Sequence, residues 1–159
     1  MTGFLTLIDG RSGAGKTVYA QRIAEAFDTR VIHMDDLYPG WQGLAYATDT
    51  LTRILAERAA GQTPTWQRWD WYAENWGEVD TLDPERPLLV EGCGSITPTT
   101  AALADRVIWL EAPEQVRRAR ALERDSTDWW WQRWAEQEEI HIAQHRPHEL
   151  ATEVIHTFD

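Results

Sequence analysis

The chain has 159 residues, and its composition is typical of a folded globular protein, with 43% hydrophobic and 26% charged residues. Its formal net charge of −11 argues against non-specific binding of nucleic acid, because the nucleic-acid phosphates would be repelled. The sequence has no apolar run long enough to span a membrane and no basic segment before an apolar one at its start, so we expect neither a membrane partner nor a secretory signal.

Predicted strands and helices alternate along the chain. Five short apolar runs are expected to be strands, at residues 2–10, 30–34, 88–92, 105–112 and 151–158. Helical spacing is found at residues 16–27, 48–60, 113–125 and 128–144. In the first helix, the residues available for a buried side are Val18, Ile23, Ala26 and Phe27. This alternation predicts an α/β fold with a parallel sheet covered on both faces, and a single domain over residues 1–159.

Residues 10–17, GRSGAGKT, match the phosphate-binding loop pattern G-x-x-x-x-G-K-[ST] without a mismatch. A predicted strand precedes this loop and a predicted helix follows it, as the pattern requires. The glycines let the backbone curl so that its N–H groups point inward, and the helix N-terminus adds partial positive charge. Together these features predict a nucleoside triphosphate site. Its expected residues are Gly10, Arg11, Ser12, Gly13, Ala14, Gly15, Lys16 and Thr17.

Two residues of this loop have specific expected roles. Lys16 is expected to reach the β- and γ-phosphates, and the hydroxyl of Thr17 is expected to bind Mg²⁺. Lys16 is the one lysine among the 15 basic residues, and the other 14 are arginine. A compact ammonium fits inside a phosphate loop, where a guanidinium would be too large.

The remaining sequence narrows the kind of nucleotide-binding protein. A GTPase needs the motif N-K-x-D, but the chain has one asparagine, Asn75, and no second lysine. Motor-type ATPases are usually longer and end the third strand in Asp, where this chain has Glu91. The short chain therefore favours a small-molecule kinase.

The segments DGRSGAGKT, HMDDLY, RWDW, LLVEG and RALERD follow one another in this order. As a series they resemble the uridine kinase and phosphoribulokinase group of P-loop kinases, over about residues 3–125. The resemblance implies a three-layer P-loop NTPase fold whose five parallel strands have the order 2-3-1-4-5. It also implies a helical lid at about 117–145 and a substrate-binding insert that begins at about residue 38 and ends at about residue 80.

The same resemblance implies roles for individual residues. Asp35 matches the aspartate that accepts the proton of the hydroxyl being phosphorylated, and Asp70 matches the aspartate that binds sugar hydroxyls. Glu91 matches the carboxylate that helps to hold Mg²⁺. Arg120 and Arg124 match the lid arginines that face the phosphates, and Arg117 shares their helix face by spacing.

Asp35 and Asp36 both stand at the end of the second predicted strand. Ligands of open α/β sheets bind beyond the carboxyl ends of the strands, and at most one of these two carboxylates is expected to face the phosphates there. If the backbone is still extended here, the two side chains point to opposite sides. The resemblance then selects Asp35 as the catalytic base, and Asp36 is expected to cap a turn or to hold Mg²⁺-bound water.

Tryptophan is unusually frequent, with ten residues in the chain. Nine lie outside the predicted sheet, at positions 41, 66, 69, 71, 76, 129, 130, 131 and 134. Such a cluster either stacks a nucleobase or packs a small core over the cleft. The expected stacking residues are Tyr38, Trp69 and Trp71.

Three histidines, His141, His145 and His148, have metal-compatible spacing, although a solvated helix end is the simpler interpretation.

The predicted activity is ATP- and Mg²⁺-dependent transfer of the γ-phosphate to a small hydroxyl acceptor, with a pyrimidine nucleoside as the leading substrate. Other acceptors remain open, namely a nucleoside monophosphate, a sugar acid or a pantothenate-like alcohol, because Glu74 stands where the family has a base-binding histidine. A nucleotide-binding regulatory module without efficient transfer is the third alternative.

The lone cysteine, Cys93, cannot form an internal disulfide, and we expect a cytoplasmic monomer or homodimer.

Overall fold

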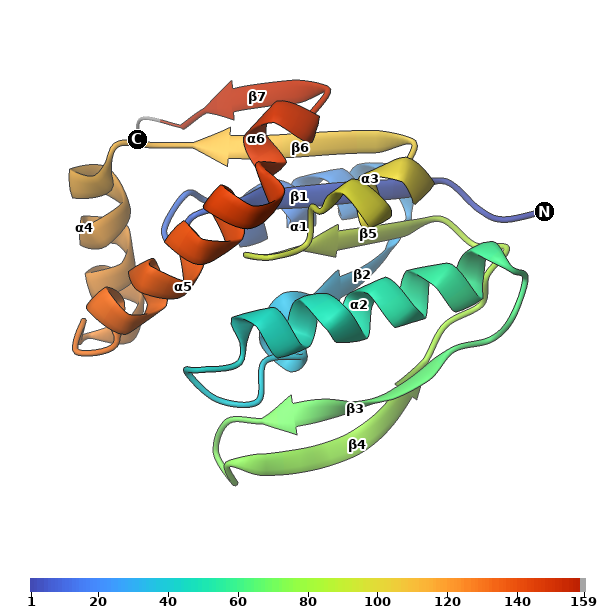
Figure 1. Ribbon diagram of the computed structural model, residues 1–159, viewed down its shortest axis with the longest axis horizontal. Helices are drawn as coiled ribbons and strands as arrows, with labels where there is room; N and C mark the ends of the chain where they lie inside the picture. Colours follow the sequence, from blue (N-terminus) through green and yellow to red (C-terminus); the bar gives the residue numbers. More distant parts are fainter. Residues whose placement is uncertain (158–159) are drawn as a thin grey trace.

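A computed structural model describes residues 1–157 of the chain as an α/β structure built in three layers (Figure 1). Within these residues, one sheet has five parallel strands in the order β2-β5-β1-β6-β7. They are β1 (Leu5–Gly10), β2 (Arg30–His33), β5 (Leu88–Glu91), β6 (Arg106–Glu111) and β7 (Glu153–His156). Numbered along the chain, the five strands follow the predicted order 2-3-1-4-5, so the predicted fold class is confirmed. Phe158, at the end of the last predicted strand, lies outside the described residues.

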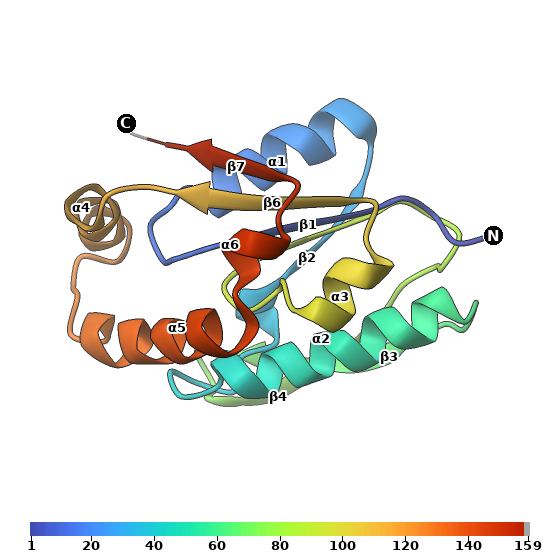
Figure 2. The same cartoon turned by 45° about the horizontal axis from the view of Figure 1, so that its top comes forward.

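Helices cover both faces of this sheet (Figure 2). One face carries α1 (Lys16–Phe27), and the other carries α2 (Leu44–Ala59), α3 (Pro98–Leu103), α5 (Trp131–His145) and α6 (Pro147–Leu150). The helix α4 (Glu114–Asp125) lies beyond the carboxyl ends of the strands (Figure 1). The short helices α3 and α6 are too brief to show a helical period in the sequence, and neither was predicted. None of the described helices is long and apolar enough to cross a membrane.

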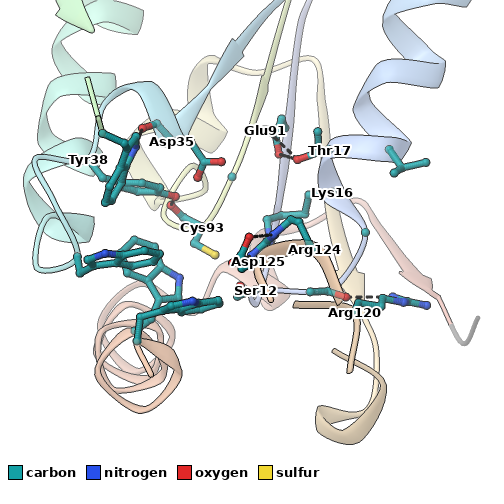
Figure 3. A pocket seen from close by; sticks show the side chains of 18 of the residues that line it. Ser12, Lys16, Thr17, Asp35, Tyr38, Glu91, Cys93, Arg120, Arg124 and Asp125 are labelled. Carbon is teal, nitrogen blue, oxygen red and sulfur yellow. Dashed lines mark hydrogen bonds and ion pairs between the residues drawn. The ribbon is translucent and has the colours of Figure 1, made fainter. Parts of the chain in front are cut away.

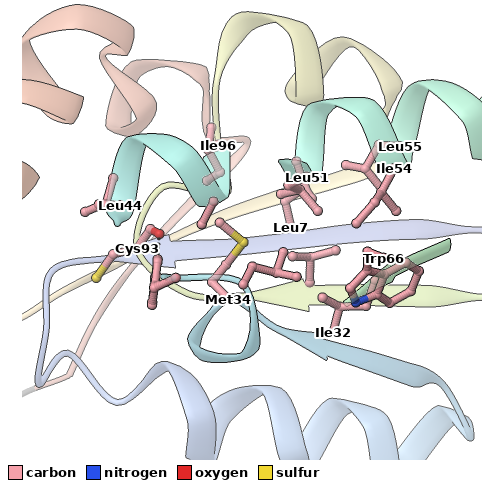
Figure 4. Close-up of a cluster of buried hydrophobic side chains, with 14 of the residues drawn as sticks. Leu7, Ile32, Met34, Leu44, Leu51, Ile54, Leu55, Trp66, Cys93 and Ile96 are labelled. Atoms are coloured by element: carbon pink, nitrogen blue, oxygen red, sulfur yellow. Dashed lines mark hydrogen bonds between the residues drawn. The ribbon is translucent and has the colours of Figure 1, made fainter. Parts of the chain in front are cut away.

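The main hydrophobic core lies between the sheet and α2 (Figure 4). Successive residues of a strand point to opposite faces, so Leu5 and Leu7 of β1 enter this core while Ile8 enters a smaller one under α1. All three side chains are completely or almost completely buried, and each burial stabilises the fold by about 1.5–3 kcal/mol.

The predicted apolar side of α1 is only partly correct. Ala20 is fully buried and Ile23 packs at the edge of the smaller core, but Val18 and Phe27 are 56% and 71% exposed. Ala26 is also exposed. The side of α1 that faces the sheet is therefore narrow, with Tyr19, Ala20 and Ile23 packed in the smaller core.

A β-hairpin occupies the tryptophan-rich stretch for which the sequence predicted no regular structure. It pairs β3 (Thr65–Asp70) with β4 (Asn75–Thr81) in antiparallel register. The register shifts between Gln67 and Trp69, and this irregularity breaks the period of two by which a strand is recognised. Trp66 anchors the hairpin to the main core, where it is 6% exposed.

The backbone turns immediately after β2. Residues Met34–Asp36 form a 3₁₀ helix, η1, with Leu37 N–H bonded to the carbonyl of Met34 at 2.8 Å. The extended conformation considered for Asp35 and Asp36 is therefore absent. The two side chains therefore do not alternate as they would in a strand, and only the tertiary structure shows where each of them lies.

Candidate active site

The loop 10–17 joins β1 to α1 at the carboxyl end of the sheet. Gly13 and Gly15 have φ of +82° and +94°, values that favour glycine. A Cβ on Gly13 would also lie 2.2 Å from the carbonyl oxygen of Arg117, so α4 can approach the loop this closely only beside a glycine. The first residue of α1 is Lys16, and the N-terminal end of the helix therefore faces the loop as predicted.

Lys16 lies inside the loop and is 9% exposed. Its Nζ donates a hydrogen bond of 2.9 Å to the carbonyl of Arg11. Burial lowers the pKa of Lys16, but the acidic groups around it, Cys93 and Glu138 first and then Glu91 and Asp9, outweigh this effect and raise the pKa above its ordinary value. The ammonium therefore keeps its charge at neutral pH, as binding of phosphate oxygens requires.

Thr17 and Glu91 form a pair of oxygen ligands next to Lys16. The Thr17 hydroxyl lies 3.3 and 3.4 Å from the two carboxylate oxygens of Glu91, which is 3% exposed at the end of β5. One of these oxygens is also 2.7 Å from Nδ1 of His33, at the end of β2. The hydrogen bond to Glu91 raises the pKa of His33 against the effect of its burial. His33 thus orients the carboxylate, a role that the sequence analysis missed.

The hydroxyl of Thr17 and the carboxylate of Glu91 are suitable ligands for Mg²⁺. This ion prefers hard oxygen ligands and usually takes only one or two from the protein, the others being water and phosphate oxygens. No group of three or more His, Cys, Asp or Glu side chains suited to a metal ion occurs in residues 1–157.

Asp35 and Asp36 have different surroundings. Asp35 lines the cleft in front of the phosphate-binding loop, and Asp36 is not among its lining residues (Figure 3). Solvent reaches the Asp35 carboxylate from the cleft although protein atoms crowd it on other sides. This crowding and the charge of Glu91 raise the pKa of Asp35, while Lys16 and Arg124 lower it in part. The geometry therefore brings Asp35, and not Asp36, to the expected phosphates.

The three α4 arginines that were candidates for the site, Arg117, Arg120 and Arg124, have different surroundings. Arg120 lines the cleft, and its Nη1 donates to the carbonyl of Gly13 and to the hydroxyl of Thr157, both at 3.1 Å. Arg124 lines the cleft too, and it forms two hydrogen bonds, of 2.8 and 2.9 Å, with Asp125. Arg117 is 7% exposed and does not line the cleft. Its Nε donates to the carbonyl of Ala112 at 3.0 Å and its Nη1 to the carbonyl of Ser12, in the phosphate-binding loop, at 3.4 Å.

The cleft has a volume of about 860 Å³ and one aromatic side. We call the described aromatic residues that line it the aromatic wall. These are Tyr38, Trp41, Trp71, Trp129, Trp130 and Trp134. Trp41 stacks on Trp130 with ring centroids 5.0 Å apart, and Tyr38 meets the edge of Trp134 at 4.7 Å. Of the predicted stacking residues, Trp71 and Tyr38 line the cleft, but Tyr38 is only 2% exposed and packs in the main core.

Trp69 and Asp70 do not line this cleft. Trp69 packs against Trp76 across the hairpin, with ring centroids 5.1 Å apart. Asp70 accepts hydrogen bonds of 2.9 Å from the N–H groups of Tyr72 and Ala73, and so it closes the hairpin turn. The geometry gives no support to the substrate-binding roles predicted for these two residues.

One face of α5 is bonded to the loops around the cleft. Glu138 is 3% exposed and accepts the N–H of Ser12 at 2.5 Å and the Sγ–H of Cys93 at 3.2 Å. One turn further, Nε2 of His141 lies 2.9 Å from the carboxylate of Asp9. This histidine is 5% exposed, so a solvated helix end is wrong for it. Neither Glu138 nor Asp9 was a candidate from the sequence, although a carboxylate within the apolar run of the first strand was a usable signal.

We expect His141→Ala to lower the free energy of unfolding by about 2–3 kcal/mol, because Asp9, which is 1% exposed, would lose a buried partner. Chemical denaturation measures this change. The matched control is His145→Ala on the same helix, which lies nearer the surface and should change stability by about 0.5 kcal/mol or less. Equal losses in the two variants would contradict a special role for the Asp9–His141 pair.

Several solved structures share this arrangement of strands and helices. A structure described as a possible uridine kinase from Bacillus stearothermophilus aligns with a TM-score of 0.71 and 19% identity, over 98% of this chain and 89% of that one. The chain has the fold of P-loop kinases. Shikimate kinase from Acinetobacter baumannii aligns with a TM-score of 0.59 and 18% identity, over 98% of this chain and 84% of that one.

A third structure, from Silicibacter sp. TM1040 and provisionally assigned as a fructose transport system kinase, aligns with a TM-score of 0.67 and 16% identity. It covers 96% of this chain and 89% of its own. No protein-family model and no curated protein matches the sequence. These neighbours differ in the acceptors that their names state, so the shared P-loop kinase fold leaves the acceptor of this chain open.

Proposed function

We propose that the protein is a kinase that transfers the γ-phosphate of ATP, with Mg²⁺, to a hydroxyl group of a small molecule. The observation that carries this proposal is the meeting of three groups at one cleft: the phosphate-binding loop with Lys16, the Thr17–Glu91 pair, and the carboxylate of Asp35. A structural loop alone would not need the other two groups. The kinase folds of the structural neighbours agree with the proposal.

Each of these groups has a defined task in phosphoryl transfer. The backbone N–H groups of the loop and Lys16 bind and orient the phosphates, and Arg120 and Arg124 add positive charge on the α4 side. Thr17 and Glu91 would hold Mg²⁺, which neutralises phosphate charge. Asp35 accepts the proton of the acceptor hydroxyl as its oxygen forms the new bond to phosphorus and the bond from phosphorus to the ADP oxygen breaks.

The leading acceptor is a pyrimidine nucleoside, as the resemblance to the uridine kinase group implies. The aromatic wall supports this choice because Trp41, Trp71 and Trp129 leave flat apolar surface exposed at the cleft. Its other members, Tyr38, Trp130 and Trp134, are buried in the main core. The positions of Asp70 and Glu74 on the hairpin argue against recognition of the sugar and base by the residues used in that group.

A coupled assay of ADP release tests the proposal. Mg·ATP is supplied with uridine, cytidine, nucleoside monophosphates, sugar acids or pantothenate, and phosphorylated product is identified by mass. Turnover that depends on one of these hydroxyl compounds supports a kinase. ATP binding without acceptor-dependent turnover over the whole panel would contradict it and would favour a nucleotide-binding regulatory module.

The role of His33 gives a prediction of its own. We expect His33→Ala to raise the Mg²⁺ concentration needed for half-maximal activity by about 10- to 100-fold, because Glu91 would lose the partner that orients it. Activity is measured at a fixed ATP concentration while the Mg²⁺ concentration is varied, with Mg²⁺ always in excess of ATP. His156→Ala on β7, remote from Glu91, is the control, and the same shift in both variants would contradict an orienting role.

A further inference from the structure

Side chains from two distant segments hold the phosphate-binding loop by its backbone carbonyls. The carbonyl of Ala14 accepts a hydrogen bond of 2.7 Å from the hydroxyl of Thr157. The carbonyl of the preceding residue, Gly13, accepts one of 3.1 Å from Nη1 of Arg120, on α4. These donors stand 143 and 107 residues away from their acceptors in the sequence, so the contacts depend on the tertiary structure and not on the loop itself.

Thr157 is itself fixed in place. It follows β7, the edge strand of the sheet beside β6 (Figure 1). Its N–H donates to the carbonyl of Glu111 at 2.8 Å, so the backbone is still bonded to β6 at this point. Its carbonyl accepts from Nη2 of Arg120 at 3.3 Å. The hydroxyl is therefore presented to the loop from a firmly held backbone.

The direction of the hydroxyl proton follows from its two partners. Nη1 of Arg120 lies 3.1 Å from the hydroxyl oxygen, and a guanidinium can only donate. The oxygen must therefore accept from Arg120, which leaves its own proton for the carbonyl of Ala14. One hydroxyl thus orients both a carbonyl of the loop and a cation that lines the cleft.

The loop has a physical need for such a contact. Gly15 has φ of +94°, and glycine populates both signs of φ, so the peptide between Ala14 and Gly15 resists turning only weakly. In a trans peptide, the carbonyl and the following N–H point in opposite directions. With the Ala14 carbonyl held by Thr157, the N–H of Gly15 is directed away from Thr157. Gly15 lines the cleft, so this bond sets the direction of one N–H group of the expected phosphate site.

We propose that Thr157 is a positioning residue of the nucleotide site, whose hydroxyl holds the loop in the orientation that binds the β-phosphate and at the same time orients Arg120. This inference rests on the nucleotide-binding part of the proposed function and is independent of the acceptor. The simpler interpretation is that the hydroxyl only supplies a partner for the carbonyl of Ala14, which is a fully buried residue. The two interpretations differ in their consequences for phosphate binding.

Nucleotide binding to the full chain tests the inference without any turnover. Thr157→Val replaces the hydroxyl with a methyl group of similar size, and we expect it to raise the Kd for Mg·ADP, measured by titration calorimetry, by about 3- to 10-fold. The Kd for AMP, which has no β-phosphate, should change by less than about twofold. Thr157→Ser keeps the hydroxyl and should bind Mg·ADP within about twofold of the parent.

Thr152→Val is the matched control. The hydroxyl of Thr152 also donates to a backbone carbonyl, that of Val107 at 3.0 Å, but it precedes β7 and so lies at the opposite end of that strand from the loop. This variant should lose a comparable hydrogen bond and keep the parent Kd for Mg·ADP. Thermal unfolding of both valine variants shows whether their losses of stability are similar.

Several outcomes would overturn the inference. They are a parent-like Kd for Mg·ADP in Thr157→Val, an equal rise in Thr152→Val, an equal rise for AMP, and failure of Thr157→Ser to restore binding. A parent that does not bind Mg·ADP would overturn it together with the proposed function. A parent that binds Mg·ADP but phosphorylates no acceptor would count against the kinase proposal alone.

Discussion

Asp35→Asn is expected to lower kcat by about 10²- to 10⁴-fold, which corresponds to about 3–5 kcal/mol in the activation barrier. Asparagine keeps the size of the side chain but cannot accept the proton of the acceptor hydroxyl. Steady-state kinetics with the best acceptor measure the loss, and the KM for ATP should change little because the task proposed for Asp35 is at the acceptor hydroxyl and not at ATP.

Asp36→Asn is the matched control, since this neighbouring carboxylate belongs to the same turn but does not line the cleft. Its kcat should stay within a few-fold of the parent. A large loss in both variants would indicate damage to η1, and a normal kcat in Asp35→Asn would remove Asp35 from the mechanism.

The pH profile offers an independent measurement of the same residue. A base must be ionised to work, so kcat should fall as the pH drops through the pKa of Asp35. Crowding by protein atoms and the charge of Glu91 raise this pKa, so the fall should occur at a higher pH than for an ordinary aspartate. Asp35→Asn should abolish this acidic limb, whereas Asp36→Asn should keep it.

The raised pKa of Asp35 also has a consequence for stability. Folding favours the protonated form, so the stabilising contribution of this group is complete below the pKa of the unfolded chain and is lost as the pH rises through the folded pKa. At neutral pH the ionised carboxylate therefore weakens the fold. Asp35→Asn should have a higher Tm than the parent at pH 7, with the difference disappearing in acid, as expected for a group retained for function.

The second large effect is expected at the phosphate-binding loop. Lys16→Met should lower kcat/KM for ATP by about 10³-fold or more, because the variant loses the buried cation that would face the transferred phosphate. Lys16→Arg keeps the charge, yet it should also be severely impaired, since the larger guanidinium must fit the space that the ammonium occupies beside the Arg11 carbonyl.

Arg118→Met is the control for both variants. Arg118 is an exposed cation of α4 that pairs with Asp128, away from the cleft, so its loss should leave kcat/KM almost unchanged. Full activity in Lys16→Arg would show that charge alone matters at this position. Full activity in Lys16→Met would contradict phosphate binding by this lysine.

Local signals in the sequence were sufficient for the five strands of the parallel sheet and for the phosphate-binding loop pattern. The strands of the sheet are short apolar runs, and GRSGAGKT carries its own geometry because glycines, lysine and threonine act within eight consecutive residues. The sequence also put Glu91 at the end of a buried strand, and the structure has it there. The hairpin was missed because its register shift conceals the alternation of side chains.

The part of the cleft around Asp35 and the aromatic wall depends on contacts between distant segments, and the tertiary structure alone decided it. The 3₁₀ turn placed Asp35 in the cleft and Asp36 outside it, although the two are neighbours in sequence. Trp71 and Trp129 reached the same wall through Trp41, whereas Trp69 packed within the hairpin. The sequence by itself determined the loop for phosphate, because that chemistry is local. Packing between η1, the hairpin and α5 determined which aromatic rings line the cleft, because residue type and spacing carry no information about which distant segments meet.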